Sequence, residues 1–206
     1  MHPTARRTQD ERREATRTAV VDAAVALFAQ KGAQGATLQD VAVAAGLSKG
    51  AVTYHFTTKD ALVDAALARC AELLVEAVIA AEADPDAAPG FLRLRRVLDA
   101  VWRPFALGRD EARVLADLAA LARHDPRLAP ALSGGCGALE GVLARALQHC
   151  ADALGARLDT APEALAHLVL AVSLGASLTG ATPASEEADD PAGDTLLRLV
   201  AGRFTL

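Results

Sequence analysis

The spacing of apolar residues constrains the fold most, because it follows helical periodicity through most of the 206 residues. Residues 15–31 place Val20, Ala24 and Phe28 on one helical stripe, and Gly32 then provides a natural stop. Comparable patterns occupy about 58–83, 91–107, 110–124, 128–155, 162–181 and 191–204, with glycine or proline in the breaks that follow. Ala, Leu and Arg are strong helix formers, and no strand-like alternation of useful length is present. The sequence therefore predicts an all-α protein.

One passage, AAGLSKGAVTYHFTTKDAL at residues 44–62, departs from these runs with glycines, hydroxyls, lysines, a histidine and the only tyrosine. Just before it, Thr37 and Asp40 have the spacing of a helix N-cap, which predicts a short helix that Gly46 ends. Ser48 then caps a further short helix that runs to about Tyr54. Two short helices joined by a tight glycine-containing turn form a helix-turn-helix, whose second helix can enter the major groove of DNA.

Side chains on and beside this second helix suit contacts with the DNA backbone. Thr53, Tyr54 and His55 offer hydroxyl and imidazole groups to phosphate oxygens. Lys59 opens the next helix, where its charge opposes the helix dipole, so a nearby phosphate explains it better. The residues expected to contact DNA are Thr37, Gln39, Ser48, Lys49, Gly50, Ala51, Thr53, Tyr54, His55 and Lys59. Of these, Lys49, Ala51, Thr53 and Gln39 are the candidates for reading bases. Taken alone, the pattern also fits a polar turn between core helices.

The charge distribution agrees with a local anion-binding surface. The net charge is −5. Residues 1–60, however, hold eight Lys or Arg against six Asp or Glu, whereas the rest of the chain holds 13 against 20. A slightly basic N-terminal quarter thus precedes an acidic body.

The segment TLQDVAVAAGLSKGAVTYHFTTKDAL, residues 37–62, resembles the N-terminal DNA-binding domain of the TetR family of transcriptional regulators. The matching features are Thr37, Val41-Ala42, Ala45-Gly46-Leu47-Ser48, Gly50, His55-Phe56, Lys59 and Leu62, preceded by AAVALFAQKG at 23–32. The resemblance implies that the third helix is the recognition helix and that Tyr54, His55 and Lys59 contact phosphates. Many members place tyrosine three residues after the glycine, where this chain has Thr53. Whether Thr53 or Tyr54 takes the phosphate stays open at this point.

The resemblance also implies a division into two domains. Residues 1–60 form the DNA-binding domain, with 1–14 as a flexible arm, and residues 61–206 form a helical domain for ligand binding and dimerisation. Small residues in LVLAVSLGASLTG, residues 168–180, permit close helix approach, and this segment with 194–204 can form a four-helix dimer seam. The candidate interface residues are Leu168, Ala171, Gly175, Leu178, Leu197 and Val200. The alternative is that these residues fill an ordinary core within one chain.

A ligand pocket is expected near the large side chains of the C-terminal domain. Trp102 and Phe105 stand out in a chain with only 3% aromatic residues, and Pro104 is expected to break or kink their helix. His167 and Ser173 are candidates to orient a mainly apolar ligand in that pocket. Core packing is the alternative for all four residues.

Other function classes have little support. The N-terminus lacks an apolar secretory segment, and the longest oily run, 168–181, is shorter than the roughly 20 residues that a bilayer needs, so we expect a cytoplasmic protein with no membrane partner. The three cysteines are widely spaced, which favours buried helix residues over a metal site, with a redox sensor as the alternative. No catalytic or phosphate-binding motif is present.

We therefore expect a regulator that is not an enzyme, needs no cofactor and binds a near-palindromic double-stranded operator as a homodimer. A small-molecule inducer is expected to release it, which would make it a repressor. The alternatives are a helical adaptor that binds only protein and, least favoured, a small helical enzyme.

Overall fold

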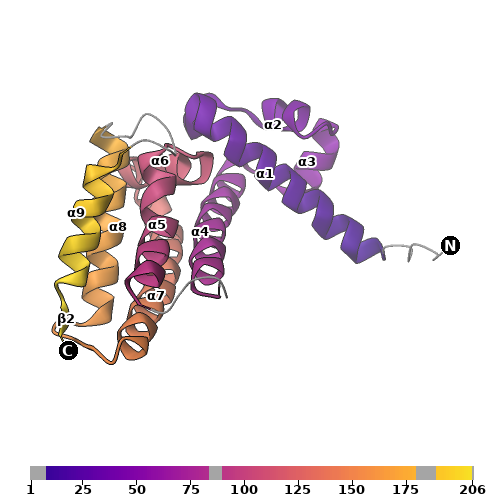
Figure 1. Cartoon of the computed structure of the whole chain (residues 1–206). Helices are drawn as coiled ribbons and strands as arrows, with labels where there is room; N and C mark the ends of the chain where they lie inside the picture. The colour runs from indigo at the N-terminus through magenta and orange to yellow at the C-terminus, as the bar shows by residue number, and fades with distance from the viewer. Residues whose placement is uncertain (1–7, 84–89, 180–188, 206) are drawn as a thin grey trace.

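The computed structural model describes residues 8–83, 90–179 and 189–205. The regular secondary structure of these residues is helical apart from one short ladder, which confirms the all-α prediction (Figure 1). The helices are α1 (Gln9–Gly35), α2 (Leu38–Ala44), α3 (Lys49–His55), α4 (Lys59–Ala83), α5 (Phe91–Ala106), α6 (Asp110–Ala122), η1 (Pro126–Leu128), α7 (Ala129–Ala153), α8 (Pro162–Thr179) and α9 (Pro191–Ala201). The strands are β1 (Arg157–Leu158) and β2 (Phe204–Thr205), which pair antiparallel. Two-residue strands are too short to produce a periodic pattern, so the sequence analysis missed them.

Helix α4 connects the two parts of the molecule. It packs against α1 on one side and against α5, α6 and α7 on the other. Figure 1 shows α1, α2 and α3 at one end of α4 and the bundle of α5 to α9 beside the rest of it. The expected domain boundary at residue 60 therefore lies inside the first turn of α4.

The first helix is longer than the sequence analysis expected. Residues 9–14, assigned there to a flexible arm, belong to α1. The cause is a capping box, in which the Glu11 amide donates to Thr8 Oγ1 at 3.2 Å and the Thr8 amide donates to Glu11 Oε2 at 2.7 Å. Residues 1–7 of the expected arm lie outside the described residues.

Helix α5 is not interrupted by its proline. Pro104 lies in the last turn, and the helix continues to Ala106. Its buried face, which includes Trp102 and Phe105, packs against α4, α8 and α9. Of the two expected effects, a break or a kink, the break does not occur: Pro104 lies two residues before the helix ends, where the missing amide costs one hydrogen bond of the last turns.

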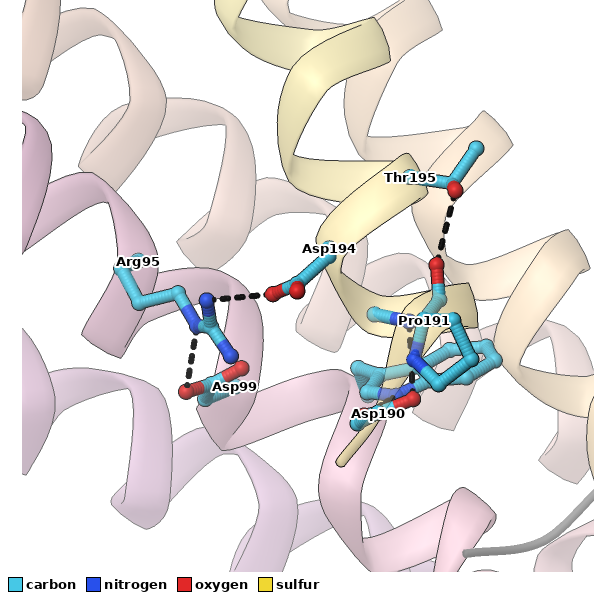
Figure 2. A network of polar contacts seen from close by, with 8 residues as sticks. Arg95, Asp99, Asp190, Pro191, Asp194 and Thr195 are labelled. Carbon is cyan, nitrogen blue, oxygen red and sulfur yellow. Dashed lines mark hydrogen bonds and ion pairs between the residues drawn. The ribbon is translucent and has the colours of Figure 1, made fainter. Parts of the chain in front are cut away.

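A polar network fastens the start of α9 to α5 (Figure 2). The Trp102 Nε1–H donates to Asp190 Oδ2 at 2.6 Å, while the other oxygen of Asp190 accepts the Gly193 amide at 2.9 Å as the N-cap of α9. Arg95 donates to Asp99 at 3.1 Å and to Asp194 at 2.6 Å, which ties α5 to the first turn of α9. This docking depends on a glycine, because a Cβ atom at Gly193 would lie 2.8 Å from Trp102 Nε1.

We predict that Gly193→Ala lowers the free energy of unfolding by about 1–3 kcal/mol, since the added methyl group must separate Trp102 from Asp190. The matched control is Gly137→Ala in α7, where a Cβ atom would meet nothing within 4 Å. There the change should be neutral or stabilising, because Ala favours a helix by about 1 kcal/mol over Gly. Urea unfolding followed by the fluorescence of Trp102 measures both variants. Equal effects of the two substitutions would contradict this role of Gly193.

Candidate DNA-binding site

The turn between α2 and α3 is built as the sequence predicts. Gly46 adopts a φ of 67°, a conformation that suits glycine, and ends α2. The Leu47 amide donates to the Ala42 carbonyl at 2.9 Å, so the chain reverses directly after α2. Both helices also begin at their predicted caps, with Thr37 Oγ1 accepting from the Asp40 amide at 3.1 Å and Ser48 Oγ accepting from the Ala51 amide at 3.2 Å.

The cap of α2 is reciprocal. The Asp40 carboxylate accepts from the Thr37 hydroxyl at 2.8 Å and from the Thr37 amide at 2.9 Å. These hydrogen bonds, that of the side chain first, lower the pKa of Asp40 below its ordinary value, so the carboxylate stays charged and capping at neutral pH. Gln39, in the first turn of this helix, is exposed.

Helix α3 is held by two apolar anchors. Val52 is fully buried, and Phe56, its C-cap residue, is 3% exposed. Val52 therefore packs inward and is not available to a thymine methyl group. On the outer surface, Lys49 and Gly50 are exposed, and Ala51 is partly exposed. The expected base-reading residues thus include an exposed cation at the start of the helix.

The two candidates for the phosphate contact differ in exposure and in hydrogen bonding. The Thr53 hydroxyl bonds to carbonyl oxygens of its own helix, those of Lys49 at 3.1 Å and Gly50 at 3.2 Å. Tyr54 is 67% exposed, and its ring meets the His55 ring edge-on with centroids 5.2 Å apart. Tyr54 is therefore the better placed of the two to reach a phosphate, since its hydroxyl extends farther from the helix.

Lys59 has a partner that the sequence analysis did not foresee. Its Nζ donates to the Gln34 carbonyl oxygen at 2.8 Å, which links the first turn of α4 to the end of α1. An ammonium group carries three donors, so two remain for a phosphate. The contact fixes the position of the Lys59 charge beside the helix-turn-helix.

Two arginines of α1 also approach α3, and the sequence analysis missed them. The guanidinium carbon of Arg13 lies 5.4 Å from the centroid of the Tyr54 ring, and that of Arg17 lies 5.4 Å from the centroid of the Phe56 ring. The Thr8–Glu11 spacing of a capping box is the signal that predicts a helix long enough to bring them there.

The residues expected to line a ligand pocket do not face a common space. Trp102 is 2% exposed and Phe105 is fully buried, both within the core. Ser173 is buried with its hydroxyl donating to the Val169 carbonyl at 2.8 Å. The placement of His167 in an interior is wrong, because its side chain is 72% exposed and lies 2.8 Å from Glu140.

A cavity of about 340 Å³ lies instead at the junction between the helix-turn-helix and the body. Its walls come from the end of α1, the first turns of α4 and the corner between α6 and α7, with Ala33, Val63 and Leu128 among them. Lys59 lines it as well, as do Arg127 and Asp60, which form an ion pair.

Most of the expected dimer residues form an exposed stripe on α8. Leu168 is 46% exposed and Leu178 is 58% exposed, with Ala171 and Gly175 exposed between them. The sequence analysis missed Val172 on the same stripe, at 40% exposure, and Leu199 on α9, at 60%. Leu197 is partly buried. The choice of Val200 is wrong, because its side chain is 1% exposed within the single chain.

The three cysteines lie in buried or partly buried surroundings. Burial raises the pKa of Cys70 to about 12 and that of Cys150 to about 11, and it also raises the pKa of Cys136. All three thiols therefore stay protonated at neutral pH, which weakens the alternative of a redox sensor.

Comparisons with known proteins agree with this site. Residues 20–66 match the family described as "Bacterial regulatory proteins, tetR family". The HTH-type transcriptional repressor KstR2 of Rhodococcus jostii is 42% identical over 48 residues, which are 23% of this chain and 24% of that protein. The matched segment thus spans about a quarter of the length of this relative.

Solved structures extend the likeness over the whole fold. A regulator assigned to the TetR family from Rhodococcus sp. has a TM-score of 0.73 at 24% identity, covering 93% of this chain and 100% of that one. The multidrug binding protein EbrR, complexed with imidazole, has a TM-score of 0.61 at 26% identity, covering 92% and 95% of the two chains. The body of α5 to α9 is therefore shared in architecture with these proteins.

Proposed function

We propose that this chain is a member of the TetR family of bacterial regulatory proteins and a cytoplasmic repressor, which binds a near-palindromic operator as a homodimer and leaves it on binding a small molecule. DNA-binding transcriptional regulation is the family's function, and the match covers the helix-turn-helix itself. The relatives are regulators, which agrees with the expectation that the chain is not an enzyme.

The observation that carries the proposal is the two-sided build of α3. Its inner side is anchored by Val52 and Phe56, and its outer side presents Lys49, Gly50 and Tyr54 without apolar cover. A short helix fixed in this way can lie in a major groove without disturbing the core.

A dimer is supported by the unpartnered apolar stripe of α8. This helix has a mean hydropathy of 1.3 and is, by length and composition alone, long and apolar enough to cross a membrane. Only a third of it is buried, however. Packing of α8 and α9 against their copies would cover Leu168, Val172 and Leu178 and would account for that composition. A bilayer explains it less well, because the opposite face of α8 packs against α5 and α7.

The junction cavity supports a ligand-controlled release. Its volume of about 340 Å³ lies in the usual range for small-molecule sites, roughly 300–1,000 Å³. A ligand there would contact the first turn of α4, which carries Lys59. Release requires the ligand to bind the DNA-incompetent arrangement better, since equal affinity for both shifts nothing.

The first prediction from the proposed function concerns DNA binding. Lys59→Ala should weaken binding to all duplexes and lower the slope of log K against log salt by about one unit for each protomer. Lys49→Ala should instead alter which bases are preferred. Arg157→Ala, an exposed cation on β1 in the body, is the matched control and should change neither. Fluorescence anisotropy with duplexes selected from genomic fragments measures all three. Affinity that is independent of salt, or no duplex binding at all, would sink the proposal.

The second prediction tests the dimer. Gly175→Arg introduces a charge into the proposed seam, and a Cβ atom there meets nothing within 4 Å, so the single chain can hold the new side chain without strain. We expect monomers with unchanged helix content and far weaker operator affinity. Light scattering and circular dichroism check this. A variant that remains dimeric would refute the placement of the seam.

The third prediction tests the ligand site. Ala33→Phe should fill the junction cavity and raise the concentration of an inducing compound needed for DNA release by about 10-fold or more, with little effect on DNA affinity alone. Trp102→Phe, in the core of the body, tests the other location; it loses the hydrogen bond to Asp190 and should lower stability, but it should leave release by the compound unchanged. The assay is operator release by a panel of apolar and aromatic compounds. If Ala33→Phe leaves release unchanged and Trp102→Phe impairs it, the ligand binds inside the body instead.

A further inference from the structure

The first turns of α1 are helical without being part of the core. Residues 9–15 and 17–19 are exposed, and burial begins only at Val20. Together with the partly buried Thr16 they make eleven residues, which span about 16 Å of helix at 1.5 Å per residue. Figure 1 shows this end of α1 running past α3 and projecting beyond it. Core burial does not explain why this segment is ordered, whereas the capping box of Thr8 and Glu11 does.

This projecting segment turns one basic face toward the recognition helix. Arg13 and Arg17 are four residues apart, so they lie on the same side of α1, and each stacks near an aromatic ring of the α3 region. Arg17 also has an acidic partner, since its guanidinium lies 3.7 Å from Glu14. Arg13 has no carboxylate partner among the residues that the structure describes, although it is exposed.

The geometry points to Arg13 as a further phosphate-binding residue, positioned beside α3 by the ring of Tyr54. A guanidinium group that stacks on an aromatic face keeps its five N–H donors in its own plane, where they remain free for an anion. A phosphate bound there would lie next to the exposed Tyr54. The helix-turn-helix and the start of α1 would then contact one continuous stretch of the DNA backbone. This inference rests on the proposed function, because it assigns an additional contact to the same DNA.

Tyr54 acts in this arrangement as a positioning residue as well as a contact. An exposed cation–π pair favours the stacked rotamer by about two- to five-fold, which limits how far the Arg13 side chain wanders from α3. The ring is the necessary part for this role, and the hydroxyl is not. The two roles of Tyr54 can therefore be separated by substitution.

The first experiment measures the salt dependence of duplex binding by the full-length protein. Arg13→Ala should lower the slope of log K against log salt by about 0.9 for each protomer, as expected for the loss of one phosphate contact. Arg12→Ala is the matched control, because it removes the same charge from the next position, about 100° around the helix. We expect a clearly smaller effect there. Equal losses for the two variants, or an unchanged slope for Arg13→Ala, would overturn the inference.

The second experiment separates the ring of Tyr54 from its hydroxyl. In a Tyr54→Phe background, Arg13→Ala should still lower the slope of log K against log salt by about 0.9 for each protomer, because the aromatic ring remains. In a Tyr54→Leu background, Arg13→Ala should lower the slope of log K against log salt only slightly, because the guanidinium no longer has a ring to stack on. Identical effects of Arg13→Ala in both backgrounds would show that Tyr54 does not position it. Helix content by circular dichroism confirms that each variant is folded.

The outcomes distinguish this inference from the proposed function. Failure of the unaltered protein to bind any duplex at low salt would defeat both. Binding by the unaltered protein with the normal slope in Arg13→Ala would defeat only the contact assigned here.

Discussion

The burial of α4 is the constraint on which the other features depend. One uninterrupted helix, Lys59–Ala83, follows the end of α3 after three intervening residues and supplies buried side chains such as Leu62, Leu67 and Leu74. Because α1 packs on one side of it and α5, α6 and α7 on the other, α4 cannot shift without disturbing both parts of the molecule. Its first turn is fixed twice by polar contacts, by Lys59 on the Gln34 carbonyl and by Asp60 on Arg127. Exposed ion pairs of this kind contribute little energy, so these contacts set position more than stability.

The parts of the fold that sequence reasoning predicted well are those fixed by local chemistry. The caps at Thr37 and Ser48 and the turn at Gly46 follow from hydrogen bonds within three or four residues and from the conformational freedom of glycine. The family resemblance then assigned roles to residues that local chemistry had already placed. The same rule predicts the start of α1 at Gln9, since Thr8 and Glu11 have the capping-box spacing, but a polar and charged segment was interpreted as a flexible arm. Charge alone does not prevent a helix when its end is capped.

The parts that could not be predicted depend on which surface meets which. Apolar periodicity shows that α8 and α9 each bury a face, but it does not say whether the partner lies in the same chain. Val200 and Leu199 are adjacent in sequence, yet the first is core and the second is 60% exposed, a difference fixed by how α9 docks on α5. That docking uses the hydrogen bond from Trp102 to Asp190, 88 residues apart, which no local pattern indicates. For the same reason Trp102 and Phe105, read as pocket residues, belong to the core.

These contacts give the proposed dimer a defined route for transmitting strain to DNA. The apolar stripe of α8 lies on a helix that packs on α5 and α7, these two pack on α4, and α4 begins where the helix-turn-helix ends. Because α9 is fastened to α5 by Arg95 and Trp102, a seam built from α8 and α9 moves with the body rather than independently of it. For a given seam, the distance between the two α3 helices would then depend on the angle between each body and its α4. A ligand in the junction cavity would bind where α4 meets the body, so it would change this angle. The distance between the two α3 helices would then change while the dimer stays intact.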